Sequence, residues 1–294
     1  MTDTTSTPAL GPCSLATLAS SDAARLVDDY CSHLHCHVLA SDTLTESMAE
    51  QWQCAGLAGA TYWVLGNANG RAWLRIVDDA GAEPAKPLQR AGWMAMEILV
   101  EDVDSLAETL EGSSFEQLRP VANLELSDKI RAVQVQGANG ELLYLTQISG
   151  EVPPFQLPTA SCAVDHLFIP VLASSNRSES LAGYESLAKH GGLSFDTRVT
   201  VINQLRGLPM ESQHPLATLQ LADSSLIEID QLEQLAAPIK STQTLGGGIA
   251  MVTFYIDQIP QQFTTYQHQQ APYNGRRSCT VYGYDGERIE LIER

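Results

Sequence analysis

Two segments of similar design decide the fold: GANGELLYLTQI at residues 137–148 and GYDGERIELIE at residues 283–293. In each, an Asn-Gly or Asp-Gly pair that favours a tight turn leads into apolar and polar residues that alternate as in a strand. The two segments end corresponding halves of the 294-residue chain. Their likeness indicates an internal repeat in which each half closes on a turn and a final strand.

The two halves are joined by a proline-rich segment, GEVPPFQLPTAS at residues 150–161. Three prolines within six residues exclude a helix there and disfavour a central strand. We therefore predict a domain boundary at this segment. It separates an N-terminal domain at residues 1–150 from a C-terminal domain at residues 151–294.

Each half contains two modules in which one strand, one helix and three strands follow each other. In the third module, AVDHLFIPV predicts a strand, and the apolar spacing of SESLAGYESLAKHGG predicts a helix that ends at the glycine pair. We also expect a strand at residues 198–203 (RVTVIN) and, in the fourth module, a helix at residues 259–269 (IPQQFTTYQHQ). Four modules of about 60 to 75 residues predict an α+β fold of βαβββ units that pair to bury their sheets.

Composition narrows the class of function. The chain has 17 Lys and Arg against 35 Asp and Glu, a formal net charge of −18 that repels nucleic acids and anionic membranes. The N-terminal MTDTTSTPAL lacks a secretory pattern, and no apolar run approaches the roughly 18 to 20 residues that span a bilayer. We expect a cytoplasmic protein that acts on a small molecule, with its six cysteines as free thiols.

The order of four phrases, GWMAMEILVEDVDSLAETL, GANGELLYLTQI, AVDHLFIPV and GYDGERIELIE, resembles the vicinal oxygen chelate superfamily. This superfamily includes glyoxalase I, bleomycin resistance proteins, type I extradiol dioxygenases and methylmalonyl-CoA epimerase. The resemblance covers nearly the whole chain. It implies that modules pair into two incomplete barrels, and that the first and last strands of the modules hold a divalent metal ion. Whether modules of two chains pair in a homodimer is left open.

Carried over residue by residue, the resemblance implies three metal ligands in the C-terminal half. His166 stands on the first strand of the third module, Glu228 on its last strand, and Glu290 on the last strand of the fourth module. One imidazole and two carboxylates suit Zn, Mn, Ni, Co or Fe(II). The fourth position falls on Ala250 or Met251, which are not ligands for such a metal.

The equivalent positions of the N-terminal half read Ser14 or Leu15, Arg75, Ala95 or Met96, and Tyr144. They make no conventional metal site, so the resemblance implies a degenerate N-terminal domain.

We therefore expect an enzyme, a metal-dependent lyase or isomerase that acts on a small oxygen-rich or aromatic substrate. The substrate would chelate the metal through two oxygens, and Glu228 would transfer the proton. One alternative is a type I extradiol ring-cleaving dioxygenase, which would need a second histidine where Ala250 or Met251 stands. Another is a metal-free small-molecule binding protein, since all four tryptophans lie in the N-terminal half.

Substrate contacts are predicted for Tyr273, Arg276 and Arg277, which lie just before a strand of the last module. In a chain poor in basic residues, a pair of arginines can hold a carboxylate or phosphate. The alternative for these three residues is a solvated loop. Phe168 and Tyr255 are expected to line the pocket, and the alternative for them is a place in the hydrophobic core.

The segment CSHLHCH at residues 31–37 resembles a metal site because it contains His33, His35 and His37. The helix predicted to begin near Asp22 would end in this segment and the next strand would begin, so the histidines would straddle a junction between the two. We expect surface or structural histidines rather than catalytic ones; an adventitious metal site remains the alternative.

Overall fold

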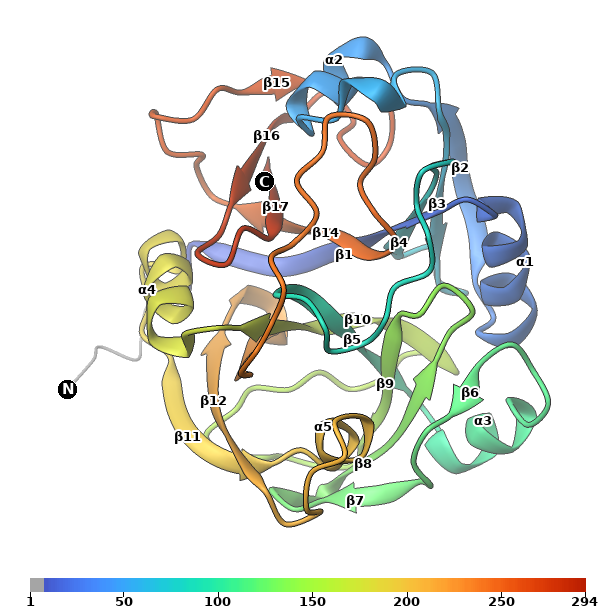
Figure 1. Cartoon of the computed structure of the whole chain (residues 1–294), viewed down its shortest axis with the longest axis vertical. Coiled ribbons are helices and arrows are strands. Elements are labelled where there is room, and N and C mark those ends of the chain that lie inside the picture. Colours follow the sequence, from blue (N-terminus) through green and yellow to red (C-terminus); the bar gives the residue numbers. More distant parts are fainter. Residues whose placement is uncertain (1–7) are drawn as a thin grey trace.

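The computed structural model describes residues 8–294 and contains four successive modules of the expected kind (Figure 1). The first module comprises β1 (Leu10–Ser20), α1 (Ala23–His33), β2 (His37–Thr43), α2 (Glu46–Gln51), a 3-10 turn (Ala55–Leu57), β3 (Thr61–Gly66) and β4 (Ala72–Asp78). The second comprises β5 (Gly92–Val100), α3 (Val103–Thr109), β6 (Glu116–Gln117), β7 (Ala122–Leu124), β8 (Ser127–Gln136) and β9 (Leu142–Ile148).

The second half repeats this order, except that residues 248–293 of the fourth module contain strands and no helix. The third module comprises β10 (Val164–Ser174), α4 (Arg177–Ala188), β11 (Leu193–Arg198), α5 (Thr200–Leu205), β12 (Gln213–Gln220), a 3-10 turn (Ala222–Ser224) and β13 (Leu226–Gln231). The fourth comprises β14 (Gly248–Ile256), β15 (Tyr266–Gln267), β16 (Arg277–Tyr282) and β17 (Arg288–Glu293). No helix within residues 8–294 is long and apolar enough to cross a membrane.

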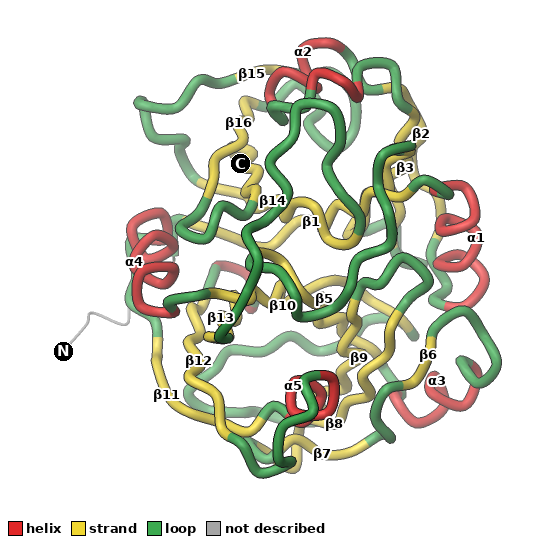
Figure 2. The backbone as a smooth tube through the Cα atoms, viewed as in Figure 1, coloured by secondary structure: helices red, strands yellow, loops and turns green. Residues whose placement is uncertain are grey.

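The modules pair into two curled sheets (Figure 2). The eight-stranded sheet has the order β15-β16-β17-β14-β1-β4-β3-β2, and the nine-stranded sheet has the order β11-β12-β13-β10-β5-β9-β8-β6. The first module thus joins the fourth through the antiparallel pair β1 and β14, and the second joins the third through β5 and β10. The α+β fold of four paired modules is confirmed.

The pairing differs from the halves predicted at residues 1–150 and 151–294, because each sheet draws its strands from both halves. The proline-rich segment connects β9 to β10, two strands of the same sheet. Prolines disfavour helices and central strands in any connecting segment, whether it joins two domains or two modules of one sheet. They mark a junction between two modules here, and not a boundary between two barrels.

The four first strands form the centre of the molecule. All nine residues of β5 and all eleven of β10 are buried. Strands β1 and β14 of one sheet pack against β10 and β5 of the other, and one hydrophobic cluster extends across both sheets. Strands buried on both faces read as continuous apolar runs without alternation, which matters for the site below.

Two local predictions were wrong. The strand expected at residues 198–203 ends at Arg198, and Thr200–Leu205 forms α5 instead. Its β-branched residues Val201 and Ile202 are buried, so tertiary packing overrides the strand propensity of the segment. The helix expected at residues 259–269 is an extended loop that leads into β15. The Ile259 N–H donates instead to the Glu293 side chain at 3.0 Å, and the β-branched Thr264 and Thr265 have low helix propensity.

Candidate active site

Strand register shows which residues of the first and last strands lie side by side. In the nine-stranded sheet Glu97 pairs with Tyr144, and Val171 pairs with Glu228. Glu97 also lies opposite Ile169 across the junction of the two modules, which brings both pairs to the middle of the sheet. In this sheet the first- and last-strand positions are therefore occupied by two carboxyl groups, a phenol and a valine.

The eight-stranded sheet has the same arrangement with different residues. Thr17 pairs with Arg75, and Thr253 pairs with Glu290. The last-strand positions expected from the sequence, at Arg75, Tyr144, Glu228 and Glu290, thus correspond to one another in the structure.

The three residues predicted as metal ligands are not brought together. Glu290 belongs to the eight-stranded sheet, whereas His166 and Glu228 belong to the other. His166 lies five residues before Val171, the strand partner of Glu228, and its Nδ1 is 2.8 Å from Asp165 Oδ1. Burial holds the pKa of His166 below its usual value. His166 is a buried, hydrogen-bonded histidine near the start of β10.

A buried ion pair fills the interior of the eight-stranded sheet. Arg75 Nη2 lies 2.9 Å from Glu290 Oε2, and both side chains are fully buried. The same carboxylate accepts hydrogen bonds from Thr253 Oγ1 (2.7 Å), Trp52 Nε1 (2.9 Å) and Tyr273 Oη (2.6 Å). The guanidinium also lies 4.3 Å from the centre of a Trp52 ring. Gln51 Nε2 donates to it as well, at 3.3 Å, so Glu290 has a cationic partner and four further donors, and Tyr273, predicted to contact substrate, is part of this network.

The other predicted substrate contacts are dispersed. The guanidinium of Arg276 lies 4.9 Å from the ring centre of Tyr255, and both residues line a separate hollow. Arg277 forms an exposed ion pair with Glu293 at 3.0 Å. Of the five predicted substrate contacts, only Phe168 lines the pocket in the nine-stranded sheet that is described next.

That pocket has a volume of about 160 Å³ and opens from the interior of the nine-stranded sheet. We call it the acid–base pocket. Its walls are mainly apolar, and the aromatic ones come from separate parts of the chain: Phe155 from the proline-rich segment, Phe168 from β10 and Phe195 from β11. Glu97 and Glu228 lie among these walls.

Both carboxyl groups have raised pKa values. Burial, and then the nearby Glu228, raise the pKa of Glu97 to about 8, although Thr146 Oγ1 donates a 2.8 Å hydrogen bond to it. Burial raises the pKa of Glu228 to about 7. The one cationic side chain that lines the described part of the pocket, Arg198, lies 3.2 Å from Glu125 and is partly exposed. Close to neutral pH, one carboxyl can therefore hold a proton while the other is ionised.

Two further acids of the interior lack partners. Asp230 stands two residues after Glu228 on β13 and is fully buried, and neither of its oxygens has a hydrogen-bond partner among residues 8–294. Burial and the Glu228 charge hold its pKa well above the usual range. The Tyr144 hydroxyl, which lines the pocket, is likewise without a partner in the described chain, and burial raises its pKa. The phenol can therefore donate to a ligand at neutral pH.

The donor set does not fit the metal site that the resemblance implies. Within residues 8–294 no group of three or more His, Cys, Asp or Glu could hold a metal ion. The lining of the acid–base pocket offers two buried carboxyls and a phenol but, over its described residues, no imidazole. The shell of one histidine and two carboxylates is therefore not assembled at the expected residues.

The histidine-rich segment lies where it was expected. Helix α1 ends at His33 and β2 begins at His37, so the segment spans the junction between them. Cys36 is buried, and His35 and His37 are exposed.

Sequence reasoning missed Glu97 as a candidate. It is the only charged residue in GWMAMEILV, and apolar neighbours flank it on both sides. Glu228 and Glu290 also have apolar neighbours on both sides, but they were recognised because the resemblance places ligands on the last strand of a module.

Comparisons with known proteins identify the fold. No family model matches the sequence, and no curated protein matches it significantly. Glyoxalase I from Zea mays is similar in structure, with a TM-score of 0.59 at 14% identity over 96% of this chain and 92% of that chain. A Bacillus subtilis protein provisionally assigned as a dioxygenase has a TM-score of 0.63 at 10% identity, over 98% of this chain and 86% of that chain.

Proposed function

Because the chain has the fold of the vicinal oxygen chelate superfamily, we propose that it is an isomerase or lyase that transfers a proton on a small, largely apolar carbonyl compound. The observation that carries the proposal is the pair of buried carboxyls, Glu97 and Glu228, in an apolar pocket. Their pKa values, raised to about 8 and about 7, suit proton transfer near neutral pH.

The two carboxyls have different roles. Glu228 has the lower pKa, so its carboxylate is the base that removes a proton from the carbon beside the carbonyl group. Glu97 retains its proton to higher pH and donates a hydrogen bond to the carbonyl oxygen as negative charge develops there. Tyr144, the strand neighbour of Glu97, offers its free hydroxyl to the same oxygen. Glu228 then returns the proton to a different carbon of an isomerase substrate.

The walls define the substrate class. Phenylalanines and aliphatic side chains surround a volume of about 160 Å³, which suits a small apolar or aromatic body. The same walls exclude water, which strengthens hydrogen bonds to a developing oxyanion.

The proposal assigns each step to side chains of the chain itself. A divalent metal, where one is bound by proteins of this fold, acts as a Lewis acid on substrate oxygens. The extradiol alternative requires two imidazoles and a carboxylate, and no histidine lies in the described lining of the acid–base pocket. The binding-protein alternative differs from ours only in turnover, so an assay of carbon–hydrogen exchange separates the two.

The test is exchange of the α-hydrogens of small ketones in D₂O, followed by proton NMR with acetophenone and 2-cyclohexenone as probes. We expect catalysed exchange that Glu228→Gln reduces by about a hundredfold or more, the usual range for loss of a general base. Glu116→Gln on β6 is the control, because Glu116 is exposed and does not line the pocket. Exchange by Glu228→Gln at the wild-type rate would refute the assignment of the base.

A further inference from the structure

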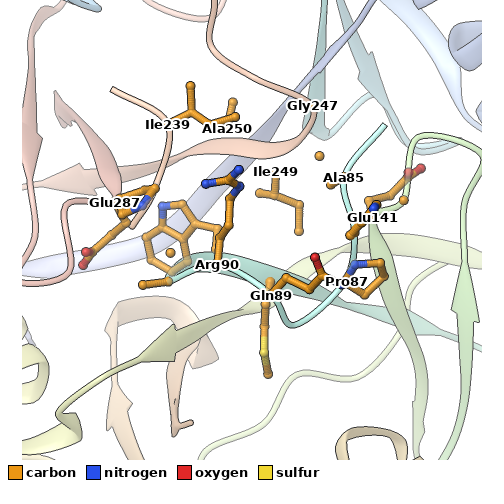
Figure 3. A pocket seen from close by; sticks show the side chains of 18 of the residues that line it. Ala85, Pro87, Gln89, Arg90, Glu141, Ile239, Gly247, Ile249, Ala250 and Glu287 are labelled. Atoms are coloured by element: carbon orange, nitrogen blue, oxygen red, sulfur yellow. The ribbon is translucent and has the colours of Figure 1, made fainter. Parts of the chain in front are cut away.

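A second pocket, separate from the acid–base pocket, lies where the connections between modules meet (Figure 3). Its volume is about 370 Å³. Residues 83–94 line one side, residues 238–239 and 245–250 another, and the turns before β9 and β17 complete it. We call it the junction pocket.

The junction pocket is richer in cations than the molecule as a whole. The chain carries a net charge of −18, yet Lys86, Arg90 and Arg288 all line this pocket. Three acids also line the pocket: Glu83 is exposed, and the carboxyls of Glu141 and Glu287 point away from the centre (Figure 3). Glu141 accepts a hydrogen bond from Tyr30 and Glu287 accepts one from Tyr184.

Arg288 is the least satisfied of these cations. Arg288 is buried, with 4% of its surface exposed. Its Nη1 and Nη2 reach the carbonyls of Ile239 and Ser241 at 3.4 Å each, at the limit of a hydrogen bond. Its Nε has no partner within residues 8–294. A guanidinium has five N–H donors and pairs best with a carboxylate or phosphate. The acceptors that Arg288 reaches are neutral carbonyls, and its Nε–H is left without one.

We propose that the junction pocket binds a small organic anion, with a carboxylate or phosphate held between Arg90 and Arg288. Arg90 is exposed, and in Figure 3 its side chain extends from the start of β5 toward the segment at Ile239 and Ala250. An apolar body of the ligand has Trp93, Leu88 and Ile249 to pack against. The volume accommodates a ligand the size of an aromatic acid with substituents.

The junction pocket also adjoins the acid–base pocket through two strands. Trp93 and Met94 line it on β5, and Glu97 follows three residues later on the same strand. Glu141 lines it just before β9, and Tyr144 follows three residues later. Three residues of strand span roughly 10 Å. The two pockets have no lining residue in common, so an anion here binds in a pocket of its own; its binding does not depend on the proposed reaction.

The test is isothermal titration calorimetry of the whole chain with benzoate, phenyl phosphate and the neutral benzyl alcohol. We expect at least one of the two anions to bind about tenfold or more tightly than benzyl alcohol, and the pair of anions distinguishes a carboxylate from a phosphate source. Arg90→Met should weaken anion binding by about tenfold or more, as expected for loss of a charge-assisted hydrogen bond. Arg131→Met is the control, because Arg131 is exposed on β8 and pairs with Asp104.

Arg288→Met should abolish anion binding. Arg288 is buried, so this variant can fail to fold; Arg90 is exposed, and Arg90→Met then provides the test. Equal affinity for benzyl alcohol, no binding of either anion at millimolar concentration, or unchanged binding by Arg90→Met would each overturn the proposal. Loss of binding by Arg276→Met instead would place the anion in the hollow beside Tyr255 and overturn it as well.

Discussion

Replacement of Arg75 by methionine tests whether the interior of the eight-stranded sheet depends on its ion pair. Arg75 and Glu290 are fully buried and 2.9 Å apart, so Arg75→Met leaves a buried carboxylate without its cation. Removing one partner of a buried pair costs about 3 to 5 kcal/mol. Thr253, Trp52 and Tyr273 continue to donate to Glu290, so we expect a loss of about 3 kcal/mol.

The assay is urea unfolding, with Arg131→Met as the matched control. Arg131 pairs with Asp104 at 2.7 Å, but both side chains are more than a third exposed, so its loss should cost about 0 to 1 kcal/mol. The double variant Arg75→Met/Glu290→Gln removes both charges; its amide oxygen can still accept from Trp52 and Tyr273, and the Thr253 hydroxyl can accept from its amide nitrogen. It should recover at least about half of the loss, which a double-mutant cycle measures. A single variant as stable as the control, or a double variant as unstable as the single one, would refute the reasoning.

Three other predictions concern the acid–base pocket and the junction pocket. The exchange rate should be highest between about pH 7 and pH 8, because Glu228 must be ionised and Glu97 protonated; a rate that still rises above pH 9 would contradict these roles. The folded state holds the Glu97 proton more tightly than the unfolded state, so its contribution to stability is full below about pH 4.5 and is lost as pH rises through about 8, a loss on the order of 4 kcal/mol. Urea unfolding at pH 5 and pH 8 should therefore show a smaller difference for Glu97→Gln than for the wild type, and an equal difference would contradict the raised pKa. Gly140→Ala should destabilise the fold by about 2 kcal/mol or more, because Gly140 has φ +82° and an added Cβ would collide with the carbonyl of Ala85; Gly70→Ala, at a similar φ of +77° in open space, is the control for backbone strain alone.

The last strands of the modules could be read from the sequence, but the first strands could not. Arg75, Tyr144, Glu228 and Glu290 each stand between two apolar residues shortly after a turn, so their facing follows from alternation. The first strands lack that signal. Strands β5 and β10 are buried on both faces, and a continuous apolar run does not reveal which residue points inward.

Each predicted first-strand position was therefore displaced along its strand. The fourth module was expected to use Ala250 or Met251, and the residue beside Glu290 is Thr253. In the second module the expected Ala95 or Met96 is replaced by Glu97. His166 attracted attention as the only histidine of its strand, yet Val171 lies beside Glu228. The pairing of modules was beyond the sequence too, because every first strand is apolar enough to pair with any other.

The two sheets show how one position changes the chemistry of a shared fold. Arg75 and Tyr144 occupy equivalent last-strand positions, one in each sheet. In the eight-stranded sheet the guanidinium of Arg75 neutralises Glu290, and the polar groups satisfy one another in a buried network. In the nine-stranded sheet a phenol stands in the same place, so no cation compensates Glu97 and Glu228 and their pKa values rise. Breaking the buried pair of the eight-stranded sheet would leave a charge without its partner, whereas the uncompensated carboxyls of the nine-stranded sheet can exchange a proton near neutral pH. Together with Glu97, which stands where the eight-stranded sheet has Thr17, the tyrosine in place of arginine explains on electrostatic grounds why the uncompensated carboxyls lie in the nine-stranded sheet.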